Sequence, residues 1–491
     1  MLDINKLVEK IHHLYQACLE DVSYVDNTQT ASPKLVLAYS GGVDSQVLAF
    51  GLSQFKLSYP AIDCLLVHVH HGLSKNAEEW AAHCVQQASS YQLPICIERV
   101  HLTIKPRQSL EAIAREARYQ AIENHLIAGD ILLTAHHQDD QLETLLLAIK
   151  RGQGPKGLAA MGEQQSAQSR SQPGLSYHKI RPLLAVSRDD IETFAALQNL
   201  SHIEDESNQD DSFDRNFLRL NIIPLLKQRW PSIAQTGSRS AALIAEQQQL
   251  IDEETRLRLP SMISHSNVNS MHYNGVGLNL DSLATQTPAW QTQLLRAFIF
   301  QQGFAAPSQI QLQQMLIQLV EAKEDANIHI EFSGAVLKRY AQYAYVLDKS
   351  VLTSSAIGVD ALASAKIQVW LNKIVLDSSL SDLSIVLPYF PWQLQLVTVQ
   401  QGNRLALPKD INQVRIQYGA AGSIKCLPQF EHKSRQQARE LKKLWHEAGI
   451  APWRRQQVPL LFYGDKLVAA LGLWLDKKYL AQQDEIGLNI Y

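Results

Sequence analysis

The chain has 491 residues, of which 46% are hydrophobic and 19% charged, and its formal net charge is −3. This is the composition of a globular protein, and no apolar run approaches the roughly 18 residues that a membrane helix needs. The N-terminal residues mix charged with apolar side chains and lack a signal-peptide core, so we expect a cytoplasmic protein with no membrane partner. The five cysteines are widely spaced and form no C-x-x-C pair, which disfavours a disulfide framework, a zinc site or an iron–sulfur cluster.

The first predicted elements are a helix within residues 1–30 and a strand from Lys34 to Tyr39. The strand runs into Ser40-Gly41-Gly42-Val43-Asp44-Ser45, and helical spacing follows, which predicts strand, tight turn and helix. Two adjacent glycines allow positive φ and let successive N–H groups converge on phosphate oxygens at a helix N-terminus. The turn is therefore expected to bind phosphate.

The side chains of this loop favour a nucleotide with a bound metal ion. Ser40 and Ser45 add hydroxyl donors. The carboxylate of Asp44 would repel a phosphate unless Mg²⁺ lay between them. No Walker pattern G-x-x-x-x-G-K-[ST] occurs, and no G-x-G-x-x-G follows a strand, so the better-known nucleotide motifs are excluded. An ordinary glycine-rich turn is the alternative that the hexapeptide alone leaves open.

Three further strands, at residues 61–72, 95–100 and 130–135, alternate with helices at 77–91 and 109–119. This alternation predicts a doubly wound α/β domain with a parallel sheet. Ligands bind at the carboxyl ends of parallel strands, so side chains there are site candidates. The histidines that end the second strand lack the partners of a zinc site, so a metal role is disfavoured. Contact with a ligand at the strand end is left open. These histidines are His68, His70 and His71.

The helix that follows Ser109, its expected N-cap, carries two arginines on one face. These are Arg115 and Arg118. Their spacing fits a solvated, ion-paired helix surface as well as a functional site, and the sequence alone leaves both open.

The strand at residues 130–135 delivers His136 and then an acidic cluster, Asp139, Asp140 and Glu143, in the first turns of a helix. Acids at a helix N-terminus suit the macrodipole without any further function. However, this cluster follows a buried strand and so is expected at the same sheet edge as the glycine loop, where Mg²⁺ would need oxygen ligands.

Residues 163–172 are polar and without periodicity, which predicts a surface insertion. Further on, an acidic run at 204–214 is followed by Arg215 and Arg219, which are spaced i, i+4 in a helical pattern. Two arginines pointing together are suited to holding pyrophosphate or a carboxylate, although ion pairing with the acidic run is the plain alternative.

The remainder of the chain divides by pattern into a second, mainly helical unit and a third, α+β unit, with a Ser-rich, strand-containing connector between them. In the third unit, seven Lys or Arg stand against two acids within residues 433–455, where a helix is expected at 436–449. Trp445 and Trp453 are interleaved with these cations, which favours RNA contact over a solvated face. The expected segments are 1–230, 231–350, 351–383 and 384–491.

These motifs, taken in order, resemble the tRNA(Ile)-lysidine synthases, a family within the PP-loop ATP pyrophosphatases. The resemblance rests on residues 40–45, 70–73, 111–119, 136–144, 181–184 and 214–219, and on the segments around 452–455 and 458–461. It implies that the wobble cytidine of a CAU anticodon in tRNA(Ile) is adenylated at its 2-carbonyl oxygen. Free L-lysine would then displace AMP through its ε-amino group to give lysidine.

The resemblance also implies ATP and Mg²⁺ as cofactors, and it leaves a homodimer open. Residues Ser40, Gly41, Gly42, Val43, Asp44 and Ser45 would bind ATP phosphates. Asp44, Asp140 and Glu143 would serve the metal or the substrate. The implied catalytic residues are Asp44, His136, Asp140, Glu143, Arg115 and Arg219, with Arg118 and Arg215 as neighbours.

Two other functions are weighed against this one. A tRNA cytidine thiolase would want a cysteine pair for sulfur or iron–sulfur chemistry, and the sequence has none. A non-catalytic tRNA-binding protein with a relic ATP site is countered by the complete set of acids and arginines. Pyrophosphate release with and without lysine would separate all three.

Overall fold

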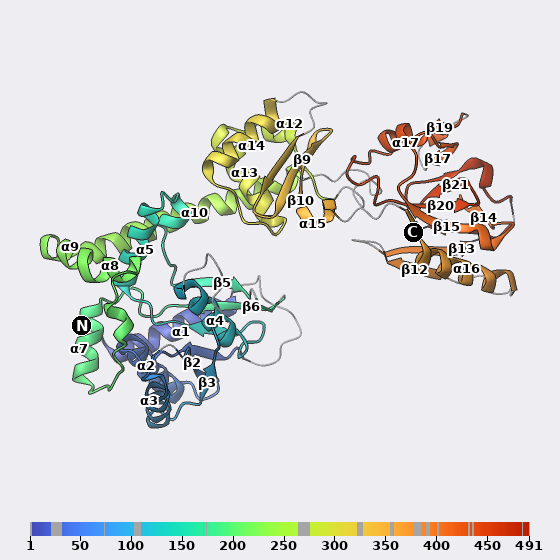
Figure 1. Cartoon of the computed structure of the whole chain (residues 1–491). Coiled ribbons are helices and arrows are strands. Elements are labelled where there is room, and N and C mark those ends of the chain that lie inside the picture. Colours follow the sequence, from blue (N-terminus) through green and yellow to red (C-terminus); the bar gives the residue numbers. More distant parts are fainter. Residues whose placement is uncertain are drawn as a thin grey trace. The chain divides into compact units, whose positions relative to one another are not determined.

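The computed structural model describes most of the chain, and only these residues are discussed below. They are 2–20, 32–72, 74–102, 110–169, 171–172, 174–263, 275–321, 328–353, 358–376, 384–388, 393–399, 402–430, 433–434, 437–483 and 485–490. The chain divides into two units, Met1–Asp252 and Glu253–Tyr491, which are described separately (Figure 1). Within the described residues, we find no helix with the length and apolar character that a membrane span requires.

The first unit is built on a six-stranded sheet in the order β3-β2-β1-β4-β6-β5. All pairs are parallel except the last, which confirms the expected doubly wound α/β fold (Figure 1). The strands are β1 (Leu35–Ala38), β2 (Cys64–His70), β3 (Ile95–Arg99), β4 (Ile131–Leu133), β5 (Gln164–Gln168) and β6 (Ser176–Ile180). β1 and β4 are almost wholly buried apolar runs, as expected for central parallel strands covered on both faces.

Helices cover both faces of this sheet. One core holds buried residues of α1 (Ile4–Glu20), α2 (Val43–Ser58), α3 (Ala77–Ser90) and α7 (Arg188–Leu197). The core on the other face is formed with α4 (Leu110–Glu123). The expected N-cap Ser109 lies outside the described residues, as do Leu73 of the histidine motif and the side chain of Glu111.

The polar segment 163–172 differs from expectation. It was expected to be a patternless insertion, but it contains β5, which pairs antiparallel with β6 at the edge of the sheet. An edge strand needs no apolar alternation when much of it faces water, and the exposed residues of β5 are polar. The strand β5 is therefore held in place by its backbone pairing with β6 and by Arg181, whose Nη2 donates to Gln165 Oε1 over 3.2 Å.

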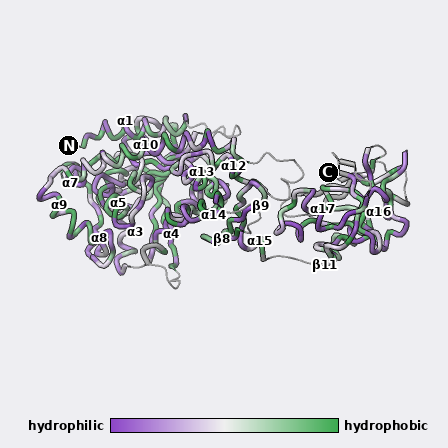
Figure 2. The backbone as a smooth tube through the Cα atoms, turned by 90° about the horizontal axis from the view of Figure 1, so that it is seen from above, coloured by the Kyte–Doolittle hydropathy of each residue, from purple (hydrophilic) through white to green (hydrophobic). Residues whose placement is uncertain are grey.

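The unit continues through helices that carry further site candidates. These are α5 (Gln138–Lys150), α6 (Pro155–Leu158), α8 (Asp214–Phe217), a π-helical turn (Leu218–Ile222), α9 (Ile223–Arg229) and the long α10 (Ile233–Met262), which crosses the boundary between the units. Hydrophobic and hydrophilic residues are interspersed along the helices (Figure 2), as expected where one face of a helix packs on a core.

The second unit begins with helices and an antiparallel sheet in the order β7-β10-β9-β8. Its elements are β7 (Leu278–Asn279), α12 (Leu280–Ala284), α13 (Pro288–Gln301), α14 (Gln309–Glu321), β8 (His329–Phe332), β9 (Ala335–Tyr340), β10 (Tyr343–Asp348) and α15 (Lys349–Thr353). Their buried side chains share one core. The mainly helical character expected for this part is confirmed.

The C-terminal part is α+β, with a seven-stranded sheet in the order β11-β15-β20-β21-β22-β17-β18 and two smaller sheets. The elements of the seven-stranded sheet are β11 (Gly358–Asp360), β15 (Val414–Tyr418), β17 (Pro428–Phe430), β18 (Lys433–Ser434), β20 (Pro459–Tyr463), β21 (Lys466–Ala470) and β22 (Trp474–Asp476). Beside it stand α16 (Ala361–Leu376), β12 (Ser384–Pro388), β13 (Gln393–Val399), β14 (Leu405–Ala406), β16 (Lys425–Cys426), β19 (Arg439–Glu440), α17 (Leu441–Glu447) and β23 (Gly487–Ile490).

Two expectations for this part need correction. Residues 351–383 are not simply a connector, because α16 buries Ile367, Trp370 and Leu371 in the C-terminal core. The helix expected at 436–449 is shorter: α17 spans Leu441–Glu447, and the residues before it form β19, which pairs with β16. Arg435 and Gln436, included in the expectation, lie outside the described residues.

Candidate active site

The glycine loop has the geometry of a phosphate cradle at the end of β1. Gly41 has φ +84°, and a Cβ there would clash with Ile203 Cδ1 and lie 2.9 Å from Cys84 Sγ, so only glycine fits. Ser45 Oγ accepts from the Gly41 N–H over 3.0 Å and lies 3.0 Å from Ser40 Oγ. Gly42 is extended and precedes the first turn of α2. The loop therefore presents the exposed Ser40 hydroxyl and a helix N-terminus without a side-chain cap. Ser45 is buried, and its Oγ donates to the Gly42 carbonyl over 2.9 Å.

Asp44, in the first turn of α2, lies between two basic groups. Its Oδ2 accepts from Arg188 Nη1 over 2.5 Å, and its Oδ1 lies 3.7 Å from His137 Nε2. Oδ1 is buried and accepts no hydrogen bond from the described residues. Burial raises the pKa of Asp44, although His137 and Arg188 oppose this shift. A buried carboxylate oxygen without a hydrogen bond is a candidate for a ligand or cation that binds during function.

Asp140, in the first turn of α5, lies on the other side of His137. Its Oδ2 accepts from the His137 backbone N–H over 3.0 Å and is 3.5 Å from His137 Nε2. Its Oδ1 lies 3.4 Å from Arg219 Nη2. Burial alone would raise the pKa of Asp140, but the nearby His137, His136 and Arg215 outweigh burial and lower it. Asp140 is therefore ionised in the site.

Glu143 is fully buried and holds two arginines. Its Oε2 accepts from Arg215 Nε over 2.7 Å, and its Oε1 accepts from Arg219 Nε over 2.8 Å. A third bond joins Arg219 Nη2 to Oε2 over 3.1 Å. The side chains of Arg215 and Arg219 are 25% and 40% exposed. Since each guanidinium has five N–H donors, both arginines keep donors available for a ligand.

His136 follows β4 directly, and its Nδ1 lies 2.9 Å from Thr134 Oγ1. Burial lowers the pKa of His136 to about 3, and Arg181, Arg215 and Arg115 act in the same direction against the opposing charge of Asp140. The imidazole is therefore neutral at physiological pH and can serve as a hydrogen-bond donor or acceptor but not as a cation.

Arg115 and Arg118 lie on α4. Arg115 is exposed and lies 5.3 Å from the ring centroid of Tyr119. Its charge contributes to the lowered pKa of His136. Arg118 Nε donates to His71 Nε2 over 3.3 Å, which links the helix to the end of β2.

The structure thus brings together most of the side chains that the sequence singled out at one edge of the sheet. His137 contacts both Asp44 and Asp140, and Arg219 contacts both Asp140 and Glu143. His136 directly precedes His137 in the chain. Sequence reasoning missed His137 and Arg188, which touch Asp44 directly. The sequence does suggest a helix start here, because Ser187 is an N-cap that follows the motif at 181–184. It does not single out Arg188, because one arginine after an N-cap has no distinctive spacing.

The basic segment of the C-terminal part differs from expectation. Trp445 is 5% exposed and packs on Trp474 with ring centroids 5.1 Å apart, so the expectation that it stacks on RNA bases is wrong. Trp453 packs edge-on against Tyr340 and Tyr345. Both aromatic side chains are used within the protein.

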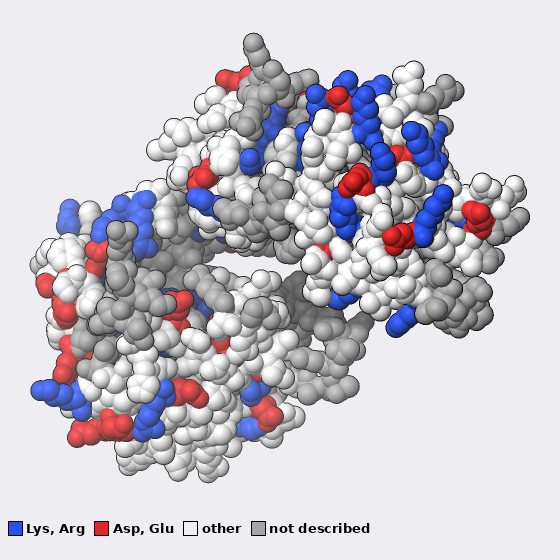
Figure 3. Space-filling view, turned by 45° about the vertical axis from the view of Figure 1, so that its right-hand side comes forward, with Lys and Arg blue, Asp and Glu red and all other residues white. Residues whose placement is uncertain are grey.

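Arg454 and Arg455 are also partly structural. Arg454 Nη1 donates to Gln457 Oε1 over 2.7 Å, and Arg455 Nε donates to the Ile450 carbonyl over 3.1 Å. Other cations of this part lie around the start of α17. The pairing of β16 with β19 sets Lys425 beside this end of the helix. We call four of these residues the α17 basic cluster: the exposed Lys425, Lys442 and Lys443 and the half-buried Arg439. Arg439 pairs with Glu447 over 2.8 Å, and Lys442 pairs with Glu440 over 3.4 Å. In Figure 3, the upper right part of the view shows many Lys and Arg side chains (blue) and fewer Asp and Glu side chains (red).

Comparisons with known proteins cover most of the chain. Family models match residues 6–226 (PP-loop domain), 278–345 (TilS substrate binding domain) and 414–491 (TilS substrate C-terminal domain). A tRNA(Ile)-lysidine synthase of Shewanella oneidensis is 52% identical over 459 residues, covering 94% of each chain. One of Shewanella woodyi is 47% identical, covering 93% of this chain and 92% of the relative. One of Yersinia pseudotuberculosis is 36% identical, covering 92% and 94%.

Proposed function

The chain belongs to the tRNA(Ile)-lysidine synthase family, and on that premise we propose how its own residues carry out lysidine formation. The enzyme is an ATP-consuming ligase that modifies tRNA(Ile). The proposed course is adenylation of the 2-carbonyl oxygen of the wobble cytidine, release of pyrophosphate, and displacement of AMP by the ε-amino group of free lysine. The observation that carries it is the convergence of Asp44, Asp140, Glu143 and two arginines beside the glycine loop.

In this proposal the glycine loop binds the phosphates of ATP. Gly41 takes the positive φ that the turn requires, Ser40 supplies an exposed hydroxyl that Ser45 contacts, and the first turn of α2 supplies N–H groups from Val43 onward. A helix N-terminus favours a phosphate through its free N–H groups and its dipole. The side-chain hydrogen bonds between Ser40, Gly41 and Ser45 hold the loop in this shape before ATP arrives.

We assign Mg²⁺ to Asp44 and Asp140. The fit rests on the buried Asp44 Oδ1, which accepts no hydrogen bond from the described residues, and on a second carboxylate across His137. Carboxylate oxygens together with phosphate oxygens are the ligands that Mg²⁺ prefers. When bound, the ion would offset phosphate charge as pyrophosphate leaves.

Glu143 was also expected as a metal ligand, and we propose a different role for it. Both its oxygens already accept hydrogen bonds from Arg215 and Arg219. We propose that Glu143 fixes the two guanidiniums, whose remaining donors stabilise charge on the phosphates during adenylation. Preorganised donors of this kind need not reorient when charge develops.

His136 and Arg115 complete the proposed site. Because His136 is neutral, it can donate to or accept from the base or the nucleotide without adding charge. Arg115 is exposed and electrostatically close to His136, which suits contact with an anionic substrate such as the tRNA backbone.

The second unit provides the proposed tRNA-binding surface, consistent with its matches to two substrate-domain models. We propose that the α17 basic cluster neutralises tRNA phosphates. Free lysine as second substrate, a cytoplasmic location and a homodimer stay predictions.

The order of chemistry is the direct test. Radiolabelled ATP and tRNA(Ile) without lysine should release pyrophosphate and leave AMP on the tRNA, and a lysine chase should convert this adduct to product. If label appears first on lysine or on the protein, the proposed order is wrong. If no label is transferred until lysine is added, adenylation before lysine entry is likewise refuted.

A further inference from the structure

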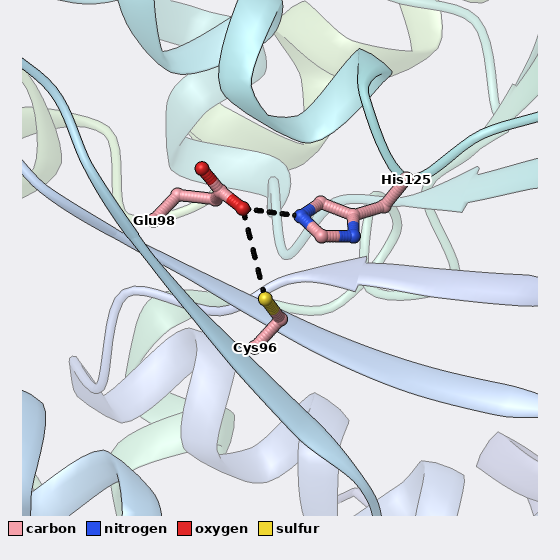
Figure 4. A group of neighbouring side chains, drawn as sticks. All are labelled: Cys96, Glu98 and His125. Carbon is pink, nitrogen blue, oxygen red and sulfur yellow. Dashed lines mark hydrogen bonds and ion pairs between the residues drawn. The ribbon is translucent and has the colours of Figure 1, made fainter.

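Three side chains of different chemistry meet at the edge of the first unit's sheet, and none takes part in the proposed reaction. They are Cys96 and Glu98 of β3 and His125, which follows α4 (Figure 4). Their Sγ, carboxylate and ring-nitrogen atoms all lie within 4.8 Å of one another. His125 Nε2 is 2.7 Å from Glu98 Oε1, and Cys96 Sγ is 3.7 Å from the same oxygen.

The fold holds all three in place through their backbones. Cys96 and Glu98 are two residues apart on a strand and so project from the same face of the sheet. The register of β3 on β2 fixes them, because Cys96 lies opposite Val67 and Glu98 opposite Val69. His125 is held by its neighbours, since Ile122 and Leu126 are buried in the core between the sheet and α4.

We propose that Cys96, Glu98 and His125 form a binding site for a zinc ion. Cysteine sulfur, histidine nitrogen and a carboxylate oxygen are the three ligand types that zinc takes in proteins. The side chains of His125 and Glu98 are 22% and 30% exposed, so an ion can enter and a water molecule can fill the fourth position. Mg²⁺ is a poor match because it prefers oxygen ligands.

Two simpler explanations are weighed against this site. The first is an ion pair between Glu98 and His125 alone, but it leaves unexplained why a thiol lies against the same carboxylate oxygen. The second is a reactive cysteine, but Cys96 Sγ lies 3.7 Å from a carboxylate oxygen of Glu98, whereas reactive thiolates lie in electropositive surroundings. The absence of a C-x-x-C pair had argued against zinc from sequence, yet here ligands far apart in the chain are joined by the fold.

Such an ion would add a link between β3 and the end of α4. β3 is an edge strand that pairs only with β2 among the described strands. α4 carries Arg115 and Arg118. Zinc bound by Cys96, Glu98 and His125 would therefore join the sheet edge to the turn that directly follows the helix carrying these arginines.

The test uses the full chain and Co²⁺, a spectroscopic substitute for Zn²⁺, titrated in excess Mg²⁺ to occupy the carboxylates near the glycine loop. We expect one equivalent to bind with a near-ultraviolet sulfur-to-cobalt charge-transfer band, and Zn²⁺ to displace it. Cys96→Ser should abolish the band. His125→Gln should weaken affinity by more than about tenfold, the lower end of the loss seen when even an outer-shell partner is removed.

Cys18→Ala is the matched control, because Cys18 is a buried cysteine on α1, outside the proposed site, and its replacement should leave the band unchanged. Zn²⁺ should also raise the melting temperature of the wild type and the control but not of Cys96→Ser. The proposal is overturned if the wild type shows no band, if Cys96→Ser retains it, or if His125→Gln binds as tightly as the wild type. If Cys96→Ser does not fold, the wild-type spectrum and His125→Gln still decide.

Discussion

Asp44→Asn and Glu143→Gln should separate a functional carboxylate from a structural one. Both changes remove a negative charge at nearly constant volume. Burial raises the pKa of Asp44, although His137 and Arg188 oppose this shift, and one of its oxygens accepts no hydrogen bond from the described residues. The net contribution of its charge to stability is therefore small, because the cost of burial offsets the ion pair with Arg188. Glu143 is fully buried, and both of its oxygens accept hydrogen bonds from arginines.

The expected magnitudes differ accordingly. Removing one partner of a buried ion pair costs about 3–5 kcal/mol. Because Arg215 and Arg219 are 25% and 40% exposed, water can solvate them, and we expect about 3 kcal/mol for Glu143→Gln. In a unit of this size that lowers the melting temperature by about 6–12 °C. Asp44→Asn should change it by no more than about 2 °C.

The assays are pyrophosphate release from ATP and tRNA(Ile), and thermal melting of the first unit. Both variants should lose adenylation by a factor on the order of 10² or more. Glu254→Gln is the matched control, because Glu254 forms a partly exposed i, i+4 pair with Arg258 that contacts none of the site residues, and such pairs contribute little. If Asp44→Asn melts as low as Glu143→Gln, Asp44 is structural and our metal assignment fails. If Glu143→Gln melts like the wild type, Glu143 does not hold the arginines as proposed.

Three other perturbations test separate parts of the argument. Gly41→Ala should abolish ATP binding in equilibrium dialysis, because a Cβ at φ +84° would clash with Ile203; retained affinity would contradict the cradle. Lys442→Glu with Lys443→Glu should weaken tRNA binding and reduce its salt slope by roughly one for each phosphate that is no longer neutralised, leaving ATP affinity unchanged; an unaltered slope would argue against the α17 basic cluster. The folded pKa of His136 is about 3, below the value of about 6.5 in the unfolded chain. The unfolded state therefore binds more protons as the pH falls, and the wild type loses stability between pH 7 and 5. Urea unfolding should show a smaller loss over this range for His136→Gln. An unchanged slope would mean that His136 is not held neutral.

The sequence predicted the fold of the first unit well because its signals are local. An apolar run, two glycines and a helical pattern suffice to place Gly41 at the end of β1. The order of strands brought the acids to the same edge by a general rule of parallel sheets. What a single sequence could not show was pairing between distant side chains, such as Arg188 with Asp44.

Predictions from composition alone were less successful. The polar segment 163–172 was expected to be a surface insertion without a pattern of its own, yet it contains β5, whose backbone pairing the side-chain pattern does not encode. Trp445, which lies among cations in the sequence, was expected to contact RNA, but it lies on the buried face of α17. Charge and aromatic content in a window do not reveal which side of α17 faces water.

The position of β1 in the centre of its sheet has a consequence for synthesis of the protein. Strand β1 is made early, but its neighbour β4 comes much later: Lys34 donates to Asp130 across 96 residues of sequence. At about 5–20 residues per second, the chain must grow for roughly 5–20 s before the glycine loop gains its second supporting strand. Arg188 emerges later still. On the ribosome, the early chain therefore exposes an apolar strand with an open edge, and nucleotide cannot assist folding until the sheet is nearly complete. Ribosome-bound chains in which residues 131–133 have left the exit tunnel should resist protease better than chains in which these residues are still inside it.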